Sequence, residues 1–548
     1  MKQLVFVCLI LALGGILSAQ NDPQWVWATR AGGAGNDWGW LGATDQFGRS
    51  YMTGYFSDYA DFGSESFTSS GGMDVFVAQL DYLGNWLWVK TAGGTSLDQG
   101  TGISLDFDGC VYVCGTFNNS ATFGTTTLTS HGALDIFVAK LDNNGNWLWA
   151  VNAGGSGDDA GYQITTDSVG NSYITGQFSQ TANFGALSLA SVGASDIYVA
   201  KLDNDGNWLW ATRAGGLGND FGYGITRDYY GNIYTSGDFH GVADFGATSL
   251  TSTGLYYNNY VAKLDANGNW LWATRGGGTA DAELAPAISI GQGGIHLAGY
   301  FAGTADFGAV NLTSQGSQDI YVACLDIAGN WLWATRAGGP LWDAGFDIVV
   351  DGSGNSYVSG IFRSSSNFGF NIITALGDGD AFVGKVDDIG NWEWVLRGGG
   401  YGVDSAVNIS TDYDGNFFVS GGFSSTTTYG TTTYTSSGGY DVLIAKLSAG
   451  VDIDDDLAPD LSGVSNLSDA WPNPFHTGDT AYIKARIAER ENGILTLYNL
   501  RGQIIQSQQL DSGPHEIVIN GADLPAGIYL YQLKTQTVSA VKKLVLLK

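Results

Sequence analysis

Hydrophobic and polar residues alternate most regularly between Asp196 and Gly216, where the chain reads DIYVAKLDNDGNWLWATRAGG. Apolar side chains on either side of the central polar segment repeat with a period of two, which predicts strands. The segment DNDG offers Asp at the first turn position and Gly at the fourth, where a positive φ is needed. The stretch is therefore predicted to be a β-hairpin.

Near-copies of this hairpin recur along the chain. Its Trp-x-Trp signature begins at Trp25, Trp86, Trp147, Trp208, Trp270, Trp331 and Trp392, a spacing of 61 residues with one step of 62. Each unit reads as four strands, which in the third unit are residues 162–167, 171–178, 196–203 and 207–213. Short strands at this period, without helical periodicity, favour propeller blades over the alternative, a parallel β-helix.

The two ends of the repeat region complement each other. Residues 25–30 read as a fourth strand without a third, and residues 441–447 read as a third strand without a fourth. Pairing them would complete the last blade and remove two exposed edges. The sequence thus predicts an all-β fold with a seven-bladed β-propeller over residues 20–448, closed by its N- and C-terminal strands.

Several motifs carry a family resemblance. GGSGDDAGYQITTDSVGNSYITGQF, followed by DIYVAKL, resembles the bacterial β-propeller repeat family called SBBP, over about residues 24–447. The resemblance implies a propeller in an extracytoplasmic setting. It implies no common activity, because a fold does not determine function.

The N-terminus predicts export. Residues 1–19 contain Lys2, an apolar run over residues 4–13 and the small residues Ser18-Ala19, the pattern of a Sec signal peptide. That run is short for a membrane span, and no second candidate follows, so we expect no transmembrane anchor after signal removal. The remaining Cys110, Cys114 and Cys324 form no disulfide framework.

Composition narrows the classes of partner. The chain has 82 Gly, 13% aromatic residues, and 53 acidic against 23 basic residues, for a net charge of −30. Such a surface repels nucleic acid and anionic lipid, so neither is expected as a partner, and we expect a monomer. No zinc spacing, nucleophile elbow or phosphate-binding loop supports catalysis.

The C-terminal region has two parts. Residues 449–470 are acidic and predict a linker, whose Asp run lacks the Gly and Glu of an EF-hand calcium loop. Residues 471–548 alternate as in a small β-sandwich. WPNPF, LYNLRGQII, LPAGIYLYQL and KKLVLLK there resemble the type A sorting domain of type IX secretion cargo in Bacteroidota. That resemblance implies the secretion machinery as a partner, a secreted or surface location, and a domain that is commonly removed.

Carboxylates recur at the loop before each first strand. Gly-Gly is followed four residues later by Asp in six units, at Asp37, Asp98, Asp159, Asp220, Asp343 and Asp404. A ring of these residues could bind a cation such as calcium. A structural role is favoured, because Asp commonly accepts backbone N–H bonds in Gly-rich loops. No other cofactor is predicted.

Aromatic residues that one unit has and the others lack are the candidates for ligand contact. They are Trp38, Tyr256, Tyr257, Trp342 and Tyr401, each expected near one loop-bearing face that also carries the long connections with Phe-Gly between second and third strands. Each could instead be a local packing solution. The expected function is a non-catalytic surface or secreted propeller that binds a protein or glycan; the alternative is a carbohydrate-active or other hydrolytic enzyme using Asp residues near the channel.

Overall fold

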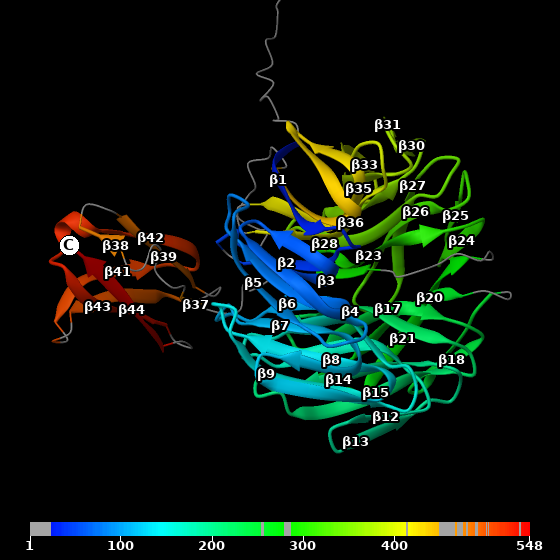
Figure 1. Ribbon diagram of the computed structural model, residues 1–548, viewed down its shortest axis with the longest axis horizontal. Helices are drawn as coiled ribbons and strands as arrows, with labels where there is room; N and C mark the ends of the chain where they lie inside the picture. Colours follow the sequence, from blue (N-terminus) through cyan, green and yellow to red (C-terminus); the bar gives the residue numbers. More distant parts are fainter. Residues whose placement is uncertain are drawn as a thin grey trace, which may run out of the picture.

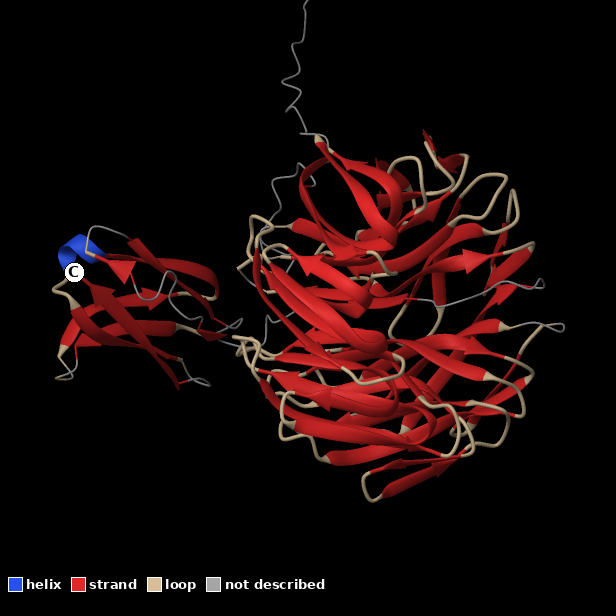
Figure 2. Ribbon diagram, in the orientation of Figure 1, coloured by secondary structure: helices blue, strands red, loops and turns tan. Residues whose placement is uncertain are grey.

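The computed structural model describes residues 23–45, 47–253, 257–278, 287–412 and 415–448, then residues 466–467, 475–477, 480–487, 491–499, 501, 503–535 and 539–548. Strands dominate (Figure 2), and within these ranges the one helix is the 3-10 helix η1 (Gly521–Asp523). No helix in the described part has the length and apolarity needed to cross a membrane. The chain is therefore all-β, as its alternating pattern predicts.

Each repeat unit forms four antiparallel strands that pair in chain order. The first two units are β2 (Trp38–Thr44), β3 (Ser50–Phe62), β4 (Glu65–Leu80) and β5 (Trp86–Ala92), then β6 (Asp98–Leu105), β7 (Val111–Phe123), β8 (Thr126–Leu141) and β9 (Trp147–Gly155). The next two are β10 (Ala160–Thr166), β11 (Ser172–Phe178), β14 (Asp196–Leu202) and β15 (Trp208–Gly216), then β16 (Asp220–Arg227), β17 (Ile233–Phe239), β20 (Asn258–Leu264) and β21 (Trp270–Gly278).

The later units follow the same order. They are β22 (Ala287–Gly291), β23 (Gly294–Phe301), β26 (Asp319–Leu325) and β27 (Trp331–Ala337), then β28 (Ala344–Val350), β29 (Ser356–Phe362), β32 (Asp380–Val386) and β33 (Trp392–Gly398). The last comprises β34 (Asp404–Thr411), β35 (Asn416–Tyr429) and β36 (Thr432–Ser448), with β1 (Gln24–Gly33) from the other end of the chain as its fourth strand.

The predicted turn chemistry is confirmed between β14 and β15. The Oδ1 atom of Asp203 accepts from the backbone nitrogens of Asp205 (3.0 Å) and Asn207 (2.8 Å), and Gly206 has φ of 84°. A side chain with a Cβ atom rarely adopts that φ, so Gly is required there. The repeated D-x-x-G-N pattern therefore places a tight turn at the same end of every unit.

The Trp-x-Trp pairs link neighbouring units. In four units the first Trp donates its Nε1 hydrogen to an Arg carbonyl of the preceding unit, as Trp270 does to Arg213 (3.1 Å). In four units the second Trp donates to the turn of the following unit, as Trp210 does to Ala266 (3.3 Å). The Nε1 atom of the buried Trp88 has no hydrogen-bond partner in the described part of the chain, so the bond is not made at every junction.

The Phe-Gly connections begin at the expected loop-bearing end of the sheets, but they are hairpins and not irregular loops. In four units they fold as short hairpins: β12 (Thr181–Phe184) with β13 (Leu187–Ala190), β18 (Val242–Phe245) with β19 (Thr248–Thr251), β24 (Thr304–Phe307) with β25 (Val310–Thr313), and β30 (Ser365–Phe368) with β31 (Asn371–Thr374). Elsewhere the long strands β3–β4, β7–β8 and β35–β36 form the same hairpin.

These hairpins cover the outer edges of neighbouring units. Ala182 in β12 pairs with Gly155 at the end of β9, the fourth strand of the preceding unit. Phe184 is buried with its ring centroid 5.1 Å from that of Trp208. The hairpin therefore protects an edge that would otherwise be open to pairing with another chain. The sequence pattern alone did not indicate this protective role.

The chain ends pair as the sequence predicts. Trp27 and Ala28 in β1 pair with Lys446 and Ala445 in β36, and Figure 1 shows the blue β1 beside the yellow β35 and β36. Trp27 also donates to the carbonyl of Tyr82 in the first unit (3.0 Å). The first strands of successive units contact each other, and β34 of the last unit contacts β2 of the first.

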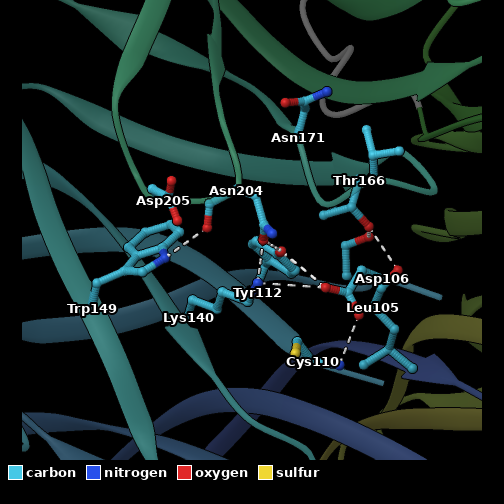
Figure 3. A network of polar contacts seen from close by, with 12 residues as sticks. Leu105, Asp106, Cys110, Tyr112, Lys140, Trp149, Thr166, Asn171, Asn204 and Asp205 are labelled. Carbon is cyan, nitrogen blue, oxygen red and sulfur yellow. Dashed lines mark hydrogen bonds and ion pairs between the residues drawn. The ribbon is translucent and has the colours of Figure 1, made fainter. Parts of the chain in front are cut away.

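A polar network shows how neighbouring units also meet at the tight turns (Figure 3). The hydroxyl of Tyr112 lies within hydrogen-bond distance of two acceptors, Oδ1 of Asn204 (2.8 Å) in the next unit and Oδ2 of Asp106 (3.0 Å) in its own. The ammonium of Lys140 contacts Asn204 and lies 3.6 Å from Asp106. The turn side chains of these two units are thus engaged in contacts that hold the units together.

The C-terminal segment forms two sheets. The first contains β37 (Asn466–Leu467), β39 (Thr480–Ile487) and β42 (Gly513–Asn520), and the second contains β38 (Phe475–His476), β40 (Gly493–Asn499), β41 (Ile504–Leu510), β43 (Gly527–Lys534) and β44 (Ser539–Leu547). Ile483 and Ile517 of the first sheet share one core with Tyr531 and Leu544 of the second. Most of the acidic segment, residues 449–465, lies outside the described residues.

We expect deletion of residues 20–30 to cause aggregation or a large loss of thermal stability, because it leaves the edge of β36 at Val442 to Leu447 unpaired. Size-exclusion chromatography with light scattering and thermal melting would measure this. Deletion of residues 20–23, which leaves β1 intact, is the control. A monomeric deletion of residues 20–30 with the parent's melting temperature would contradict the prediction.

Candidate functional site

The loops between fourth and first strands meet the ends of the second strands at one end of the sheets. Asn36 donates its backbone N–H to the Oγ atom of Ser57 (2.8 Å), and Asp158 donates to Ser179 in the same way (2.9 Å). We call this end the loop face. It lies opposite the tight turns, because each strand begins at one end of the sheet and finishes at the other.

The aromatic candidates occupy this face in separate groups. Trp38, Tyr257 and Trp342 are half-buried, Tyr401 is 77% exposed, and Tyr256 lies outside the described residues. Among the described aromatic contacts, none joins two of the four directly. The structure therefore does not bring the candidates together into one site.

Trp38 and Trp342 serve the packing between units. The ring centroid of Trp38 lies 5.2 Å from that of Tyr440, and a Cβ atom on Gly422 would come within 2.4 Å of the Trp38 ring. Trp342 makes an edge contact with Tyr300 (6.0 Å), and the Arg363 guanidinium lies 5.2 Å above its ring. Local packing accounts for both residues.

Tyr257 belongs to a row of rings at the fourth unit that sequence reasoning did not assemble. Its centroid lies 5.9 Å from that of Phe221, which lies 5.8 Å from Tyr223, which lies 5.2 Å from Tyr162 of the third unit. His240 lies 5.5 Å from Tyr257 on the other side. The sequence signal that could have found this row is the difference in residues between units, if strand positions had been compared as well as loops.

A buried carboxyl group lies close to this row. Asp238 is 0% exposed, and its Oδ1 atom accepts from Nδ2 of Asn259 (2.6 Å), whose own oxygen accepts from the Tyr321 hydroxyl (3.0 Å). Burial and then the charge of Asp238 raise the pKa values of Tyr223 and Tyr300. These tyrosines therefore keep their protons and can donate hydrogen bonds.

The six loop carboxylates are buried and bound by the backbone. Asp159 is typical: its two oxygens accept from the backbone nitrogens of Gly155 (2.7 Å) and Ser179 (3.0 Å). Gly N–H groups four residues upstream are bound likewise by Asp37, Asp98, Asp220, Asp343 and Asp404, and all six residues are 0% exposed. This arrangement supports the structural role over a cation-binding ring.

Metal binding gains no support within the described residues, which contain no group of three His, Cys, Asp or Glu side chains able to hold a metal ion. The acidic residues of the linker, where a calcium site was considered, all lie outside the described residues.

Each loop carboxylate lies near a second buried carboxylate across a junction between units. The partners, whose charges raise the loop Asp pKa values, are Asp441 for Asp37, Asp74 for Asp98, Asp135 for Asp159, Asp196 for Asp220, Asp319 for Asp343 and Asp380 for Asp404. Burial is the larger cause, and raises the pKa to about 7 for Asp98, Asp159 and Asp404 and to about 6 for Asp37, Asp220 and Asp343.

A thiol and an imidazole meet inside the fifth unit. The Sγ atom of Cys324 lies 3.5 Å from Nε2 of His296, and both residues are buried. Burial raises the pKa of the Cys324 thiol to about 12 and lowers that of His296 to about 4, so both groups are neutral near pH 7. A neutral, buried thiol is a poor nucleophile, so this pair does not support catalysis.

An apolar group that sequence reasoning missed lies on the outer hairpin of the sixth unit. Phe370 at the tip of β30–β31 is fully exposed (102%), and Ile372 is 70% exposed. The other hairpin tips carry Ser64, Thr125, Ala186, Ala247, Ala309 and Thr431. Ile372 also lines a depression of about 480 Å³ beside Pro340 and Ser366. Exposed apolar side chains of this kind mark candidate protein contacts.

The paired carboxylates predict that the protein is more stable in mild acid. Because folding raises the loop Asp pKa values from 3.8 to about 6 or 7, their contribution to stability is complete below pH 4 and is lost as the pH rises through 7. We expect the melting temperature to fall by more than about 5 °C between pH 5 and pH 8 at constant ionic strength.

The variant Asp74→Asn tests the cause, because the fourth unit carries Asn258 at the same position. Removing the Asp74 charge lowers the pKa of Asp98, so the melting temperature should rise at pH 8 and change little at pH 5. An unchanged pH dependence in this variant would contradict the explanation.

Comparisons with known proteins agree with the repeats and the terminal segment. The model of the secretion system C-terminal sorting domain matches residues 469–547, and that of the β-propeller repeat matches residues 209–238. Uncharacterized WD repeat-containing protein L264 of Acanthamoeba polyphaga mimivirus is 24% identical over 504 residues, 74% of this chain and 36% of that protein. Regulatory protein FlaEY of Caulobacter vibrioides is 26% identical over 168 residues, 29% of this chain and 18% of that protein.

Similar solved structures are distant. A fungal alcohol oxidase of the AA5 family in complex with copper has a TM-score of 0.39 at 11% identity, covering 96% of this chain and 100% of that chain. PorZ of the type-IX secretion system of Porphyromonas gingivalis has a TM-score of 0.18 at 10% identity, covering 95% of this chain and 100% of that chain. A mutant of the GH43 protein BlXynB from Bacillus licheniformis has a TM-score of 0.27 at 11% identity, covering 78% of this chain and 98% of that chain. Likeness at these TM-scores supports no statement about function.

The sorting-domain match covers the residues quoted for that resemblance, and the repeat match covers the segment of the next unit equivalent to the first motif quoted for the propeller family. The chain covers less than half of the length of either relative, so their whole-protein properties do not transfer to it. The chain therefore contains a β-propeller repeat of the SBBP type and a secretion system C-terminal sorting domain, and the sorting domain indicates export by type IX secretion to the cell surface or the extracellular space.

Proposed function

We propose that the repeat region is a closed seven-bladed β-propeller that binds a protein or a glycan through its loop face without catalysis. The domain layout proposed with it is a signal peptide at residues 1–19, the propeller at 20–448, an acidic linker at 449–470 and the sorting domain at 471–548. After export the protein acts as a monomeric binding scaffold.

Closure of the ring is supported by contacts that repeat at the chain ends. Trp25 donates to the carbonyl of Arg397 (2.9 Å), as Trp392 donates to Arg336 one unit earlier (3.2 Å). Contact between β34 and β2 repeats the contact between first strands of the other units. A ring in which every junction uses the same contacts leaves no terminal unit that needs a cap.

Binding through the loop face is supported by one observation above the others: side chains that differ from unit to unit concentrate there. In the fourth unit Phe221, Asp238, His240 and Tyr257 replace residues that differ in chemistry from unit to unit. At the opposite end the tight turns between third and fourth strands keep the same D-x-x-G-N pattern, and their residues are used for contacts between units. A scaffold that varies on one face only is suited to recognition on that face.

Two features point to different ligands. The ring cluster of the fourth unit favours a glycan, and the exposed Phe370 and Ile372 on the outer edge favour a protein partner. The alternative function, hydrolysis by Asp residues near the channel, has Asp238 in its favour. Glycoside hydrolysis normally needs two carboxyl groups, and the six loop Asp residues are bound by the backbone.

We expect the purified propeller to bind immobilised glycans or proteins and to release no products from the polysaccharides it binds. A glycan array measures binding, and reducing-end assays on the same polysaccharides measure turnover. Asp238→Asn serves as the test variant for catalysis. Turnover that this substitution abolishes would overturn the non-catalytic function.

We expect deletion of residues 471–548 to leave the propeller in the periplasm of the native host, because the sorting domain is recognised for passage across the outer membrane. Cell fractionation with an antibody against the propeller measures its location. A full-length protein produced from the same promoter is the control, and thermal melting checks that the truncated protein is folded. Normal surface display of the truncated protein would refute the domain's role.

A further inference from the structure

We infer that the loop face of the fourth unit is a binding site for a neutral saccharide, formed by Phe221, Tyr223, Tyr257 and His240 together with Tyr162 of the third unit. This inference rests on the proposed binding function and specifies its ligand and its location. The ligand class follows from the chemistry of the side chains.

The rings form a continuous row from one unit to the next. Phe221 and Tyr223 are nearly parallel, with an interplanar angle of 19° and centroids 5.8 Å apart. Tyr257 continues the row from Phe221 and is followed by His240 at 5.5 Å. All five side chains are half-buried, so the fold holds each ring on one side while part of it stays open to solvent.

The third unit shows that the propeller fold does not require these aromatics. It carries Ala160, Ser179 and Ser195 at the positions of Phe221, His240 and Tyr257, and it forms the same four strands. Three replacements of small residues by rings within one unit, with Phe221 and His240 each beside Tyr257, are therefore not explained by the shared architecture.

The group combines aromatic surface with hydrogen-bonding edges. Nδ2 of Asn219 donates to the Tyr257 hydroxyl (3.3 Å), and the protonated Tyr223 hydroxyl and the His240 ring supply further polar edges. The five side chains include no aliphatic residue such as Ile372, which is exposed on the outer hairpin. A sugar ring presents C–H groups to aromatic surfaces and hydroxyls to polar edges, so it fits this combination.

Charge favours a neutral sugar over an acidic one. The group contains no Lys or Arg, and the chain carries a net charge of −30. An anionic ligand would approach against this field without a cation to pair with. A neutral hexose or pentose chain meets no such penalty.

Calorimetric titration of the full-length secreted protein with neutral hexasaccharides of glucose, mannose and xylose tests the inference. The site variant is Phe221→Ala, His240→Ser and Tyr257→Ser combined, which copies the third unit. Tyr257→Ser alone is a milder second variant. The matched control is Tyr229→Ser with Tyr230→Val, which copies Ser168 and Val169 of the third unit at the opposite, tight-turn end.

We expect binding of at least one neutral hexasaccharide, a loss of affinity of at least tenfold in the site variant, and a change below twofold in the control. Tyr257→Ser should weaken binding while the melting temperature stays within a few degrees of the parent. Saccharide binding that both site variants retain would overturn this site and leave the proposed function standing. Binding of only acidic glycans or proteins would overturn the ligand class. If the protein binds no saccharide in the titrations and none of the immobilised glycans or proteins, both proposals are overturned.

Discussion

The structure depends on a constraint that acts on each four-stranded sheet: it is apolar on both faces and can be buried only between neighbours. In β14 and its counterparts almost every side chain is buried. At several junctions the Trp pair adds directional hydrogen bonds, since Trp270 bonds the preceding unit and Trp210 bonds the following unit. No unit is therefore stable by itself, and the order of units in space is fixed by the order of units in sequence.

The same constraint explains the buried carboxylates. Gly-rich loops between units leave backbone N–H groups without strand partners, and buried N–H groups must be bonded. An Asp four residues downstream bonds them, as Asp159 bonds Gly155. As a result, the carboxyl group of Asp159 is buried near a second carboxyl group, and both the burial and the neighbouring charge raise its pKa. Stability and pH sensitivity thus come from one loop design repeated across the units.

The two ends of the sheets have different roles because of these junctions. At the tight-turn end, side chains such as Asn204 and Tyr112 bond across units, so substitutions there disturb the packing. At the loop face the backbone is held by Asp residues and glycines, which leaves neighbouring positions such as Phe221 and Tyr257 free to differ. Recognition can therefore change at this face without altering the fold.

The sequence by itself determined the repeat, the strands, the turns and the pairing of the chain ends. Those features depend on local periodicity and on the Asp and Gly of each turn, and seven copies supplied an internal comparison. Only the tertiary structure decided that the Phe-Gly connections fold as edge hairpins, because their pairing partner, such as Gly155 for Ala182, lies in another unit. It also decided that Trp38 packs against Tyr440 while Tyr257 joins a row with Phe221 and Tyr223. Single-copy residues look alike in sequence, and the distances between their side chains arise only when strands from different repeats are brought together.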